Sequence, residues 1–446
     1  MFWEKEGKLI YSYDGETVCI EAWGKDALRV RATKNRSFTG RDWALEAKDA
    51  HAGEVEIFED PSAKGGAFAN MYEGTDTSYG KITNGKLHAV IDSGSVITFY
   101  HEDGRVLLKE HFRRLRDEES MPLNIMGREY SNGVGDNFRI VTRFVARKGE
   151  KIFGMGQYQQ HELDLKGCML ELAQRNSQVS VPFYLSSIGY GFLWNNPGVG
   201  QVMFANNGTE WVTESGKEID YLVIAGDTPA EIEENYMTLT GKPPMMPEYG
   251  MGFWQCKLRY WNQEQLLSVA RKYKELGIPL DVIIVDFFHW TKQGEFKFDP
   301  KYWPDVPGMC RELKEMGIQV VVSVWPTVDI YSENFEEMKE KGYLVRTEHG
   351  VPLTMLCGGN EVFFDATNPD ARTYVWEKIK KNYYDQGAKL FWLDVAEPEY
   401  SVYDFKNYRY QLGSVQEVGN IYPKYYLKAF YDGMTAEGDT MPISLI

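Results

Sequence analysis

The spacing of apolar residues changes near residue 228 and divides the chain into a β-like part and an α/β part. Before that point, apolar and polar residues alternate in short runs such as residues 28–33, and turn signals such as the Asn-Asn-Gly at 206–208 separate the runs. Many short strands at this spacing are typical of an antiparallel β-sandwich. We therefore predict an N-terminal β-sandwich domain over residues 1–226, with the acidic, Gly-containing residues 40–76 as a long excursion from it.

A helical signal follows directly. Thr228-Pro-Ala-Glu231 is a capping box with proline at the first helical position, and it predicts a helix to about residue 240. Prolines 243, 244 and 247 then interrupt the chain. We predict a helical linker over residues 227–247 and a second domain over residues 248–446.

Strands and helices alternate after the linker, which predicts a parallel α/β barrel or a doubly wound sheet. The apolar runs that we interpret as strands are residues 250–254, 281–287, 319–325, 389–393 and 442–446. The helical segments between and after them are residues 263–276, a helix from Pro307 to before Gly317, and residues 333–341, 368–384 and 423–434.

Carboxylates stand at the ends of two of these predicted strands. Asp286 follows the run Val-Ile-Ile-Val, and Asp394 follows Phe-Trp-Leu. Such residues can simply cap the next loop. In an α/β barrel, however, the C-terminal strand ends hold the active site. The aromatic residues that follow Asp286 favour a sugar-binding glycosidase pocket over a loop cap.

Composition narrows the class of partner. The net charge of −16, spread along 446 residues, argues against nucleic acid and against an anionic membrane surface as partners. No run of roughly 18 apolar residues indicates a membrane span. Aromatic residues make up 14% of the chain, as suits either sugar stacking or a large β-domain.

The cysteine pattern and the N-terminal residues indicate the cellular compartment of the protein. The five cysteines are widely spaced without a CxxC pattern, as expected of reduced thiols rather than a disulfide framework or a zinc site. The first residues, Met-Phe-Trp-Glu-Lys, show no signal-peptide pattern. We therefore expect a cytoplasmic protein that needs no metal or organic cofactor.

Several motifs together resemble glycoside hydrolase family 31, the retaining α-glucosidases and α-xylosidases. The stretch from Trp392 to Glu397 fits the nucleophile motif W-x-D-x-x-E of that family. The other matching segments are Gly154-Met-Gly-Gln157, residues 176–183 with Gly189-Tyr-Gly191, residues 247–253, Phe298-Asp-Pro300 and Trp303-Pro-Asp305. The resemblance covers essentially the whole chain and implies a β-sandwich followed by a (β/α)8 TIM barrel.

The resemblance assigns roles to residues. It makes Asp394 the catalytic nucleophile, which forms a covalent glycosyl-aspartate, and Glu397 a carboxylate that orients it. Asp286 would accept hydrogen bonds from sugar hydroxyls, with Phe287 beside it. Trp325 and Trp392 would wall the pocket. Lys257 either points inward or is an ordinary surface lysine.

The resemblance also implies that the general acid/base residue is missing. The general acid/base of the family is an aspartate on a later strand-end loop, and no residue up to Ile446 fits that position. A closed barrel needs eight strands, so we expect a barrel truncated after about five of them. We expect such a fragment to be inactive by itself.

Phe288 bears on which sugar is bound. The α-glucosidases of the family carry a second acid two residues after the first, whereas Asp286-Phe-Phe288 resembles its α-xylosidases. Phe288 would fill the space of the glucose hydroxymethyl group, unless it is an ordinary core residue. Release of α-linked xylose from non-reducing ends is therefore the preferred function.

Other functions stay open at this point. They are an α-glucosidase or α-transglucosylase of the same family, a noncatalytic carbohydrate-binding fragment, and a phosphate-binding barrel enzyme, which the absence of glycine-rich strand-to-helix loops disfavours. The expected partner is an oligosaccharide or an α-xyloside or α-glucoside. Whether the chain forms a homo-oligomer is left open.

Overall fold

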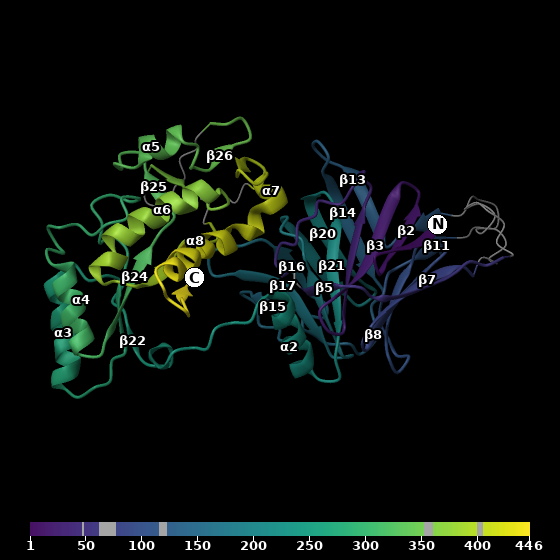
Figure 1. Cartoon of the computed structure of the whole chain (residues 1–446), viewed down its shortest axis with the longest axis horizontal. Coiled ribbons are helices and arrows are strands. Elements are labelled where there is room, and N and C mark those ends of the chain that lie inside the picture. Colours follow the sequence, from purple (N-terminus) through teal and green to yellow (C-terminus); the bar gives the residue numbers. More distant parts are fainter. Residues whose placement is uncertain (47–48, 62–76, 116–122, 352–359, 399–404) are drawn as a thin grey trace. The chain divides into compact units, whose positions relative to one another are not determined.

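The computed structural model describes residues 1–46, 49–61, 77–115, 123–351, 360–398 and 405–446 (Figure 1). The chain divides into two compact units, Met1–Pro243 and Pro244–Ile446. No helix among the described residues is long and apolar enough to cross a membrane.

The first unit consists mainly of antiparallel sheets. A nine-stranded sheet has the order β1 (Phe2–Lys5), β2 (Lys8–Tyr13), β3 (Glu16–Trp23), β4 (Ala27–Thr33), β21 (Ile219–Ala225), β18 (Tyr190–Trp194), β17 (Val179–Ser186) and β15 (Ile152–Gln157), with β5 (Ala50–His51) on β3. One five-stranded sheet runs β10 (Val106–Lys109), β9 (Ile97–His101), β8 (Leu87–Asp92), β7 (Tyr79–Asn84), β6 (Glu54–Phe58). The other runs β13 (Arg128–Asn132), β14 (Phe138–Phe144), β20 (Gly208–Gly216), β19 (Gly200–Ala205), β16 (Met169–Leu172), and β11 (Arg113–Leu115) pairs with β12 (Leu123–Ile125).

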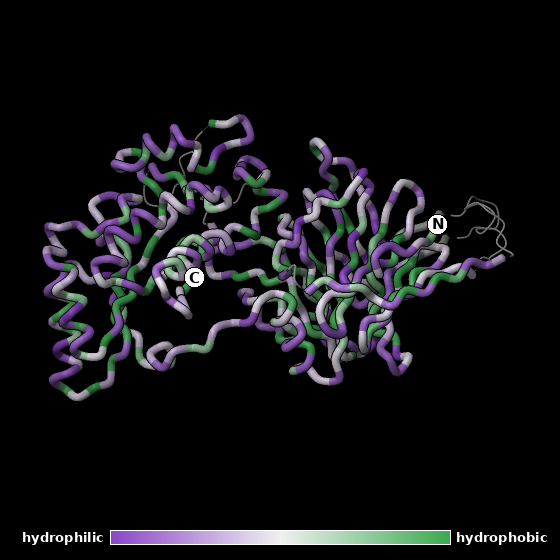
Figure 2. The backbone as a smooth tube through the Cα atoms, in the orientation of Figure 1, coloured by the Kyte–Doolittle hydropathy of each residue, from purple (hydrophilic) through white to green (hydrophobic). Residues whose placement is uncertain are grey.

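The three large sheets share one apolar core, as the predicted sandwich requires. Phe192 and Tyr221 come from the nine-stranded sheet, Phe99 from the second sheet and Trp211 from the third, and all are buried in one cluster. Figure 2 shows hydrophobic residues (green) and hydrophilic residues (purple) along these strands. The alternation that predicted the strands therefore reflects one face turned to this core.

Two segments of this unit differ from the prediction. Strand β6 lies inside the expected excursion and pairs with β7, although most of its residues are exposed. Residues 62–76 lie outside the described part. Helix α2 (Pro229–Thr240) belongs to the first unit rather than to a separate linker, because Ile232 and Leu239 are buried against its sheet.

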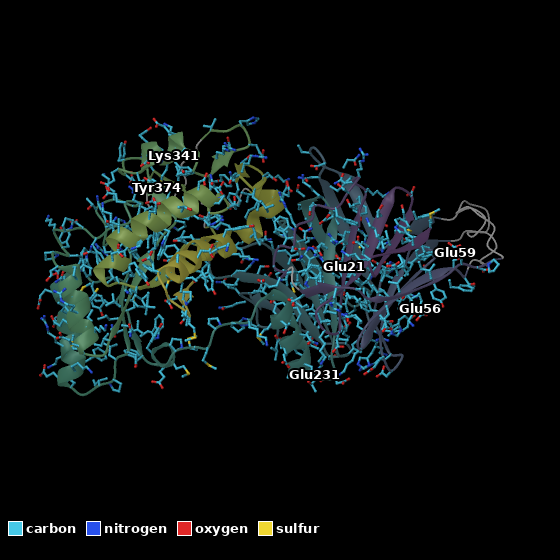
Figure 3. All side chains as sticks on the ribbon, viewed as in Figure 1. Glu21, Glu56, Glu59, Glu231, Lys341 and Tyr374 are labelled. Atoms are coloured by element: carbon cyan, nitrogen blue, oxygen red, sulfur yellow. The ribbon has the colours of Figure 1, made fainter. Side chains whose placement is uncertain are left out.

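The predicted capping box is present at the start of α2. The Thr228 hydroxyl accepts the Glu231 N–H (3.2 Å), and the Glu231 carboxylate accepts the Asp227 N–H (2.8 Å; Glu231 is labelled in Figure 3). The first bond satisfies a backbone donor that the first helical turn leaves open, and the second fixes the residue before the N-cap.

The second unit is built on a parallel sheet of five strands. Its order is β22 (Trp254–Gln255), β23 (Val282–Val285), β24 (Gln319–Val324), β28 (Leu390–Leu393) and β30 (Ser444–Leu445). Small antiparallel pairs join β25 (Thr327–Asp329) to β27 (Glu361–Phe363) and β26 (Arg346–Thr347) to β29 (Tyr408–Arg409). The helices are α3 (Gln263–Glu275), α4 (Val306–Glu315), α5 (Phe335–Glu340), α6 (Pro369–Asn382), α7 (Val415–Val418) and α8 (Tyr422–Ala436), with 3₁₀ turns η2 (Glu248–Met251), η3 (Tyr384–Gln386) and η4 (Gly419–Ile421).

Helices connect successive strands and begin at capping side chains. Asn262, Asp305 and Asn368 each accept a backbone N–H at the start of α3, α4 and α6. Pairs of helices are joined by polar contacts: Arg271 on α3 contacts Glu312 on α4 (2.5 Å). Lys341 at the end of α5 lies 5.6 Å from the Tyr374 ring centre on α6 (both labelled in Figure 3).

The first strand of this unit starts later than predicted. Residues 250–254 were expected to be extended, but η2 occupies the first two of them and only Trp254 lies in β22. Pro247 starts the 3₁₀ turn, in which the Gly250 N–H bonds to the Pro247 carbonyl (2.9 Å). The parallel sheet itself, with alternating helices, is as predicted.

Candidate active site

Three neighbouring parallel strands end at the same edge of the sheet and carry the predicted site residues there. Asp286 follows β23, Trp325 follows β24 and Asp394 follows β28, with β24 between the other two strands. Residue pairs Ile284–Val321 and Val321–Leu390 are in register. Because side chains two apart on a strand share a face, Asp286, Trp325 and Asp394 fall on one face of the sheet.

An apolar layer supports that face below the strand ends. Val282, Ile284 and Val321 form a buried cluster, and Trp254 and Trp392 pack against it. Trp392 therefore lies two residues below Asp394, within this layer. Its role in the wall of the sugar pocket stays a prediction.

The Asp394 carboxylate is held at both oxygens. Its Oδ1 accepts the Val395 N–H (3.0 Å), and its Oδ2 accepts the indole Nε1–H of Trp325 (3.0 Å). Partial burial raises the pKa of this carboxyl, while the two donors lower it. Val395 has a positive φ of 59°, which is unusual for a β-branched residue and turns the chain sharply after Asp394.

The Asp286 carboxylate is buried, with 5% of the residue exposed. Its Oδ1 accepts the Phe287 N–H (2.7 Å) and its Oδ2 accepts the Cys256 thiol (3.4 Å). Burial raises its pKa, and the charge of Asp394 raises it further. Asp286 therefore lies within reach of the charge of Asp394, as expected of acids that face one site.

His289 is buried and bonds to the backbone at the end of β23. Only 2% of the residue is exposed. Its Nδ1–H donates to the Asp286 carbonyl (2.9 Å), so Nε2 accepts the Tyr383 hydroxyl (2.9 Å). Burial lowers the pKa of His289 to about 4, and a neutral imidazole with both nitrogens bonded is a structural group, not a base.

Aromatic rings line the site next to Asp394. The Trp325 ring centre lies 5.5 Å from Phe287, 6.3 Å from Phe288 and 5.9 Å from Trp290. Phe288 is 49% exposed, so it is not a core residue. Its φ is positive (59°), an unusual backbone conformation for a bulky residue.

The Phe288 ring continues outward into a cation–π stack. The Arg259 guanidinium lies 3.7 Å from the Trp261 ring centre and 5.5 Å from that of Phe288. Trp261 is exposed. This stack follows β22 in the chain and forms a polar and aromatic rim beside Phe288.

The two other predicted site residues are Glu397 and Lys257. Glu397 is half-buried in the loop after β28, three residues beyond Asp394. The Lys257 side chain is exposed, and only its backbone N–H approaches the site, at the sulfur of Cys256. Of the two alternatives predicted for Lys257, its exposure fits an ordinary surface lysine. Trp254 faces the apolar layer, and Cys256, two residues further, shares its face.

Cys256, Trp290 and Arg259 were not predicted as site residues. For Cys256, the strand-end rule that selected Asp286 and Asp394 would have sufficed with the correct strand end, because β22 ends at Gln255. Arg259 and Trp290 lie in irregular loops, where no periodicity indicates which way a side chain points.

Comparison with known proteins identifies the family. A profile of the glycosyl hydrolases family 31 TIM-barrel domain matches residues 243–445. An uncharacterized family 31 glucosidase of Pseudescherichia vulneris is 45% identical over 99% of this chain and 82% of that protein. The chain belongs to glycoside hydrolase family 31.

Solved structures and curated relatives also include α-xylosidases. The crystal structure of a family 31 α-xylosidase from a soil metagenome, complexed with xylose, is 49% identical, with a TM-score of 0.92 over 100% of this chain. Alpha-xylosidase A of Aspergillus niger is 30% identical over 95% of this chain. The chain spans 65% of the length of the first protein and 60% of the second. The family assignment confirms the resemblance seen in the sequence motifs.

Proposed function

We propose that this chain carries the sugar-binding and nucleophile half of a retaining α-glycosidase site that accepts α-linked xylose at non-reducing ends. The observation that carries the proposal is the placement of two carboxylates, Asp286 and Asp394, on one sheet face, with the exposed Phe288 two residues after Asp286. The α-xylosidases among the relatives support the choice of sugar.

In this proposal Asp394 attacks the anomeric carbon. The leaving group departs from the opposite face of the sugar, and a covalent glycosyl-aspartate forms. The nucleophile must be ionised. The N–H groups of Trp325 and Val395 stabilise the anion and oppose the effect of burial. Glu397 is the predicted orienting carboxylate.

Asp286 recognises the sugar. A buried carboxylate accepts hydrogen bonds strongly, and its charge-assisted bonds with sugar hydroxyls would be worth about 1.5–3 kcal/mol each. Protonation of the leaving oxygen needs a second carboxyl roughly 5–5.5 Å from the nucleophile. No residue of this chain is assigned as that general acid.

Phe288 gives the preference for xylose. Xylose differs from glucose by lacking the hydroxymethyl group, and an exposed ring at this place offers apolar contact but no acceptor for the glucose hydroxyl. A hydroxyl left without a partner costs about 1–3 kcal/mol, which discriminates roughly 5–150-fold.

Release of fluoride from α-xylosyl fluoride and α-glucosyl fluoride tests the proposal. Fluoride leaves without protonation by an enzyme acid, so the assay reports the nucleophile and the sugar site alone. We expect faster release from the xylosyl compound, with a burst of about one fluoride per chain as the covalent intermediate accumulates. Asp394→Asn should abolish the burst. Faster release from the glucosyl compound would favour an α-glucosidase instead.

A further inference from the structure

Cys256 lies at the end of β22, where its thiol contacts the candidate sugar-binding carboxylate. The thiol donates to Asp286 Oδ2 at 3.4 Å. Its own backbone is fixed from the other side: Gln255 Nε2 donates to the Cys256 carbonyl (3.0 Å), and the Tyr273 hydroxyl donates to Gln255 Oε1 (2.8 Å). The thiol is therefore presented to Asp286 by a supported strand end.

Among the residues that the structure describes, the thiol is one of two donors to the Asp286 carboxylate. The other is the Phe287 N–H, on the opposite oxygen (2.7 Å). With one donor on each oxygen, the carboxylate keeps a single orientation. A thiol is a weak donor, and a carboxylate oxygen has two lone pairs, so Oδ2 retains the capacity to accept a hydroxyl group.

The contact with Asp286 also changes the pKa of the Cys256 thiol. Burial and the negative charge of Asp286 raise the pKa of the Cys256 thiol to about 12. Although the residue is exposed, its thiol is therefore protonated at neutral pH and serves as a donor rather than a nucleophile.

We propose that Cys256 is a positioning residue of the sugar site: its thiol holds the Asp286 carboxylate in the orientation that receives sugar hydroxyls. The proposal depends on the proposed function only in taking a sugar as the ligand of Asp286. The pairing of thiol and carboxylate can be tested without any substrate.

Alkylation kinetics test the pairing. The rate of carbamidomethylation of Cys256 by iodoacetamide is measured by mass spectrometry in the wild-type chain and in Asp286→Asn. Removing the charge should increase the rate at least about tenfold, since only the thiolate reacts. Cys168, in the first unit, is the internal reference, and buried Cys310 must stay slow if the variant is folded. Equal rates at Cys256 would overturn the pairing.

Protection by xylose links the pairing to the sugar site. Xylose added to the wild-type chain should slow alkylation of Cys256 while leaving Cys168 unchanged. If Asp286→Asn accelerates alkylation but xylose gives no protection, the pairing stands and the proposed sugar site at Asp286 is wrong. If neither effect is seen, the positioning role is wrong as well.

Substitutions at Cys256 test the positioning role itself. Cys256→Ala should raise KM for α-xylosyl fluoride about fivefold, the value of one hydrogen bond, with a smaller effect on kcat. Cys256→Ser keeps a donor and should return KM toward the wild-type value. An unchanged KM in the alanine variant, or an equal rise in both variants, would contradict the positioning role.

Discussion

The indole Nε1 of Trp325 donates to Oδ2 of Asp394 across 3.0 Å, from the strand next to the one that carries the aspartate. This bond joins the aromatic wall of the site to its proposed nucleophile. In the proposed function, one ring thereby contributes both to the sugar-binding surface and to the ionisation of the nucleophile.

Trp325→Phe removes this donor and keeps an aromatic ring. Because the indole N–H lowers the pKa of Asp394, its loss should raise that pKa. The acidic limb of the pH profile of kcat/KM for α-xylosyl fluoride should then move to higher pH, and the rate at neutral pH should fall by roughly 10–100-fold. An unchanged acidic limb would show that the bond does not govern ionisation of the nucleophile.

Phe288→Asp should increase the rate of α-glucosyl fluoride cleavage relative to α-xylosyl fluoride, because a carboxylate in this place can accept the glucose hydroxyl. Phe288→Leu is the matched control: it opens space but adds no acceptor. The ratio of kcat/KM for the two sugars is the measurement. An unchanged ratio in the aspartate variant excludes Phe288 as the determinant of sugar choice.

Glu361 gives a pH dependence of stability that is independent of catalysis. It is buried on β27, opposite Asp329 of β25, and burial with the charge of Asp329 raises its pKa from 4.5 to about 7. The folded state thus holds the proton more tightly than the unfolded state. Wild-type stability should fall as the pH rises through that window.

Glu361→Gln cannot titrate, so the free energy of unfolding of this variant relative to wild type should improve by up to ~3 kcal/mol between about pH 4 and about pH 8. Urea denaturation at both pH values gives the difference. Glu340→Gln, at an exposed position on α5, is the control and should follow wild type. A Glu361→Gln difference that does not change with pH would contradict the assignment of a buried, protonated carboxyl.

A chelator should leave the fluoride burst unchanged. Retaining hydrolysis uses carboxyl groups as nucleophile and acid, and neither step needs a metal ion. The measurement compares the burst before and after dialysis against EDTA. Loss of the burst, restored by a divalent cation, would show that a metal site takes part.

The sequence predicted the parts of this fold that repeat a simple pattern. Apolar runs located β23, β24 and β28, and Asp286 and Asp394 were found because strand ends follow such runs. The same reasoning placed the start of β22 too early, since a 3₁₀ turn after Pro247 has no apolar periodicity. The predicted strand also ended at residue 254, one residue before β22 ends, so the strand-end rule did not select Cys256.

Contacts that join distant loops could not be predicted in this way. Nothing in the local sequence indicates that Arg259 stacks against Trp261 and Phe288, or that His289 bonds to Tyr383, 94 residues further along the chain. For α2, the capping box gave the position of the helix, but only the buried Ile232 and Leu239 side chains show which unit it joins.

The most direct test of the account is the identity of the residue that becomes covalently glycosylated. The chain is incubated with 2-deoxy-2-fluoro-α-xylosyl fluoride, whose fluorine slows breakdown of the glycosyl-enzyme, and its peptides are mapped by mass spectrometry. The account predicts one added fluoroxylosyl group, on Asp394, that is absent in Asp394→Asn and forms more slowly in Asp286→Asn. A label on another carboxylate, or a label that persists in Asp394→Asn, would contradict the assignment of Asp394 as the nucleophile.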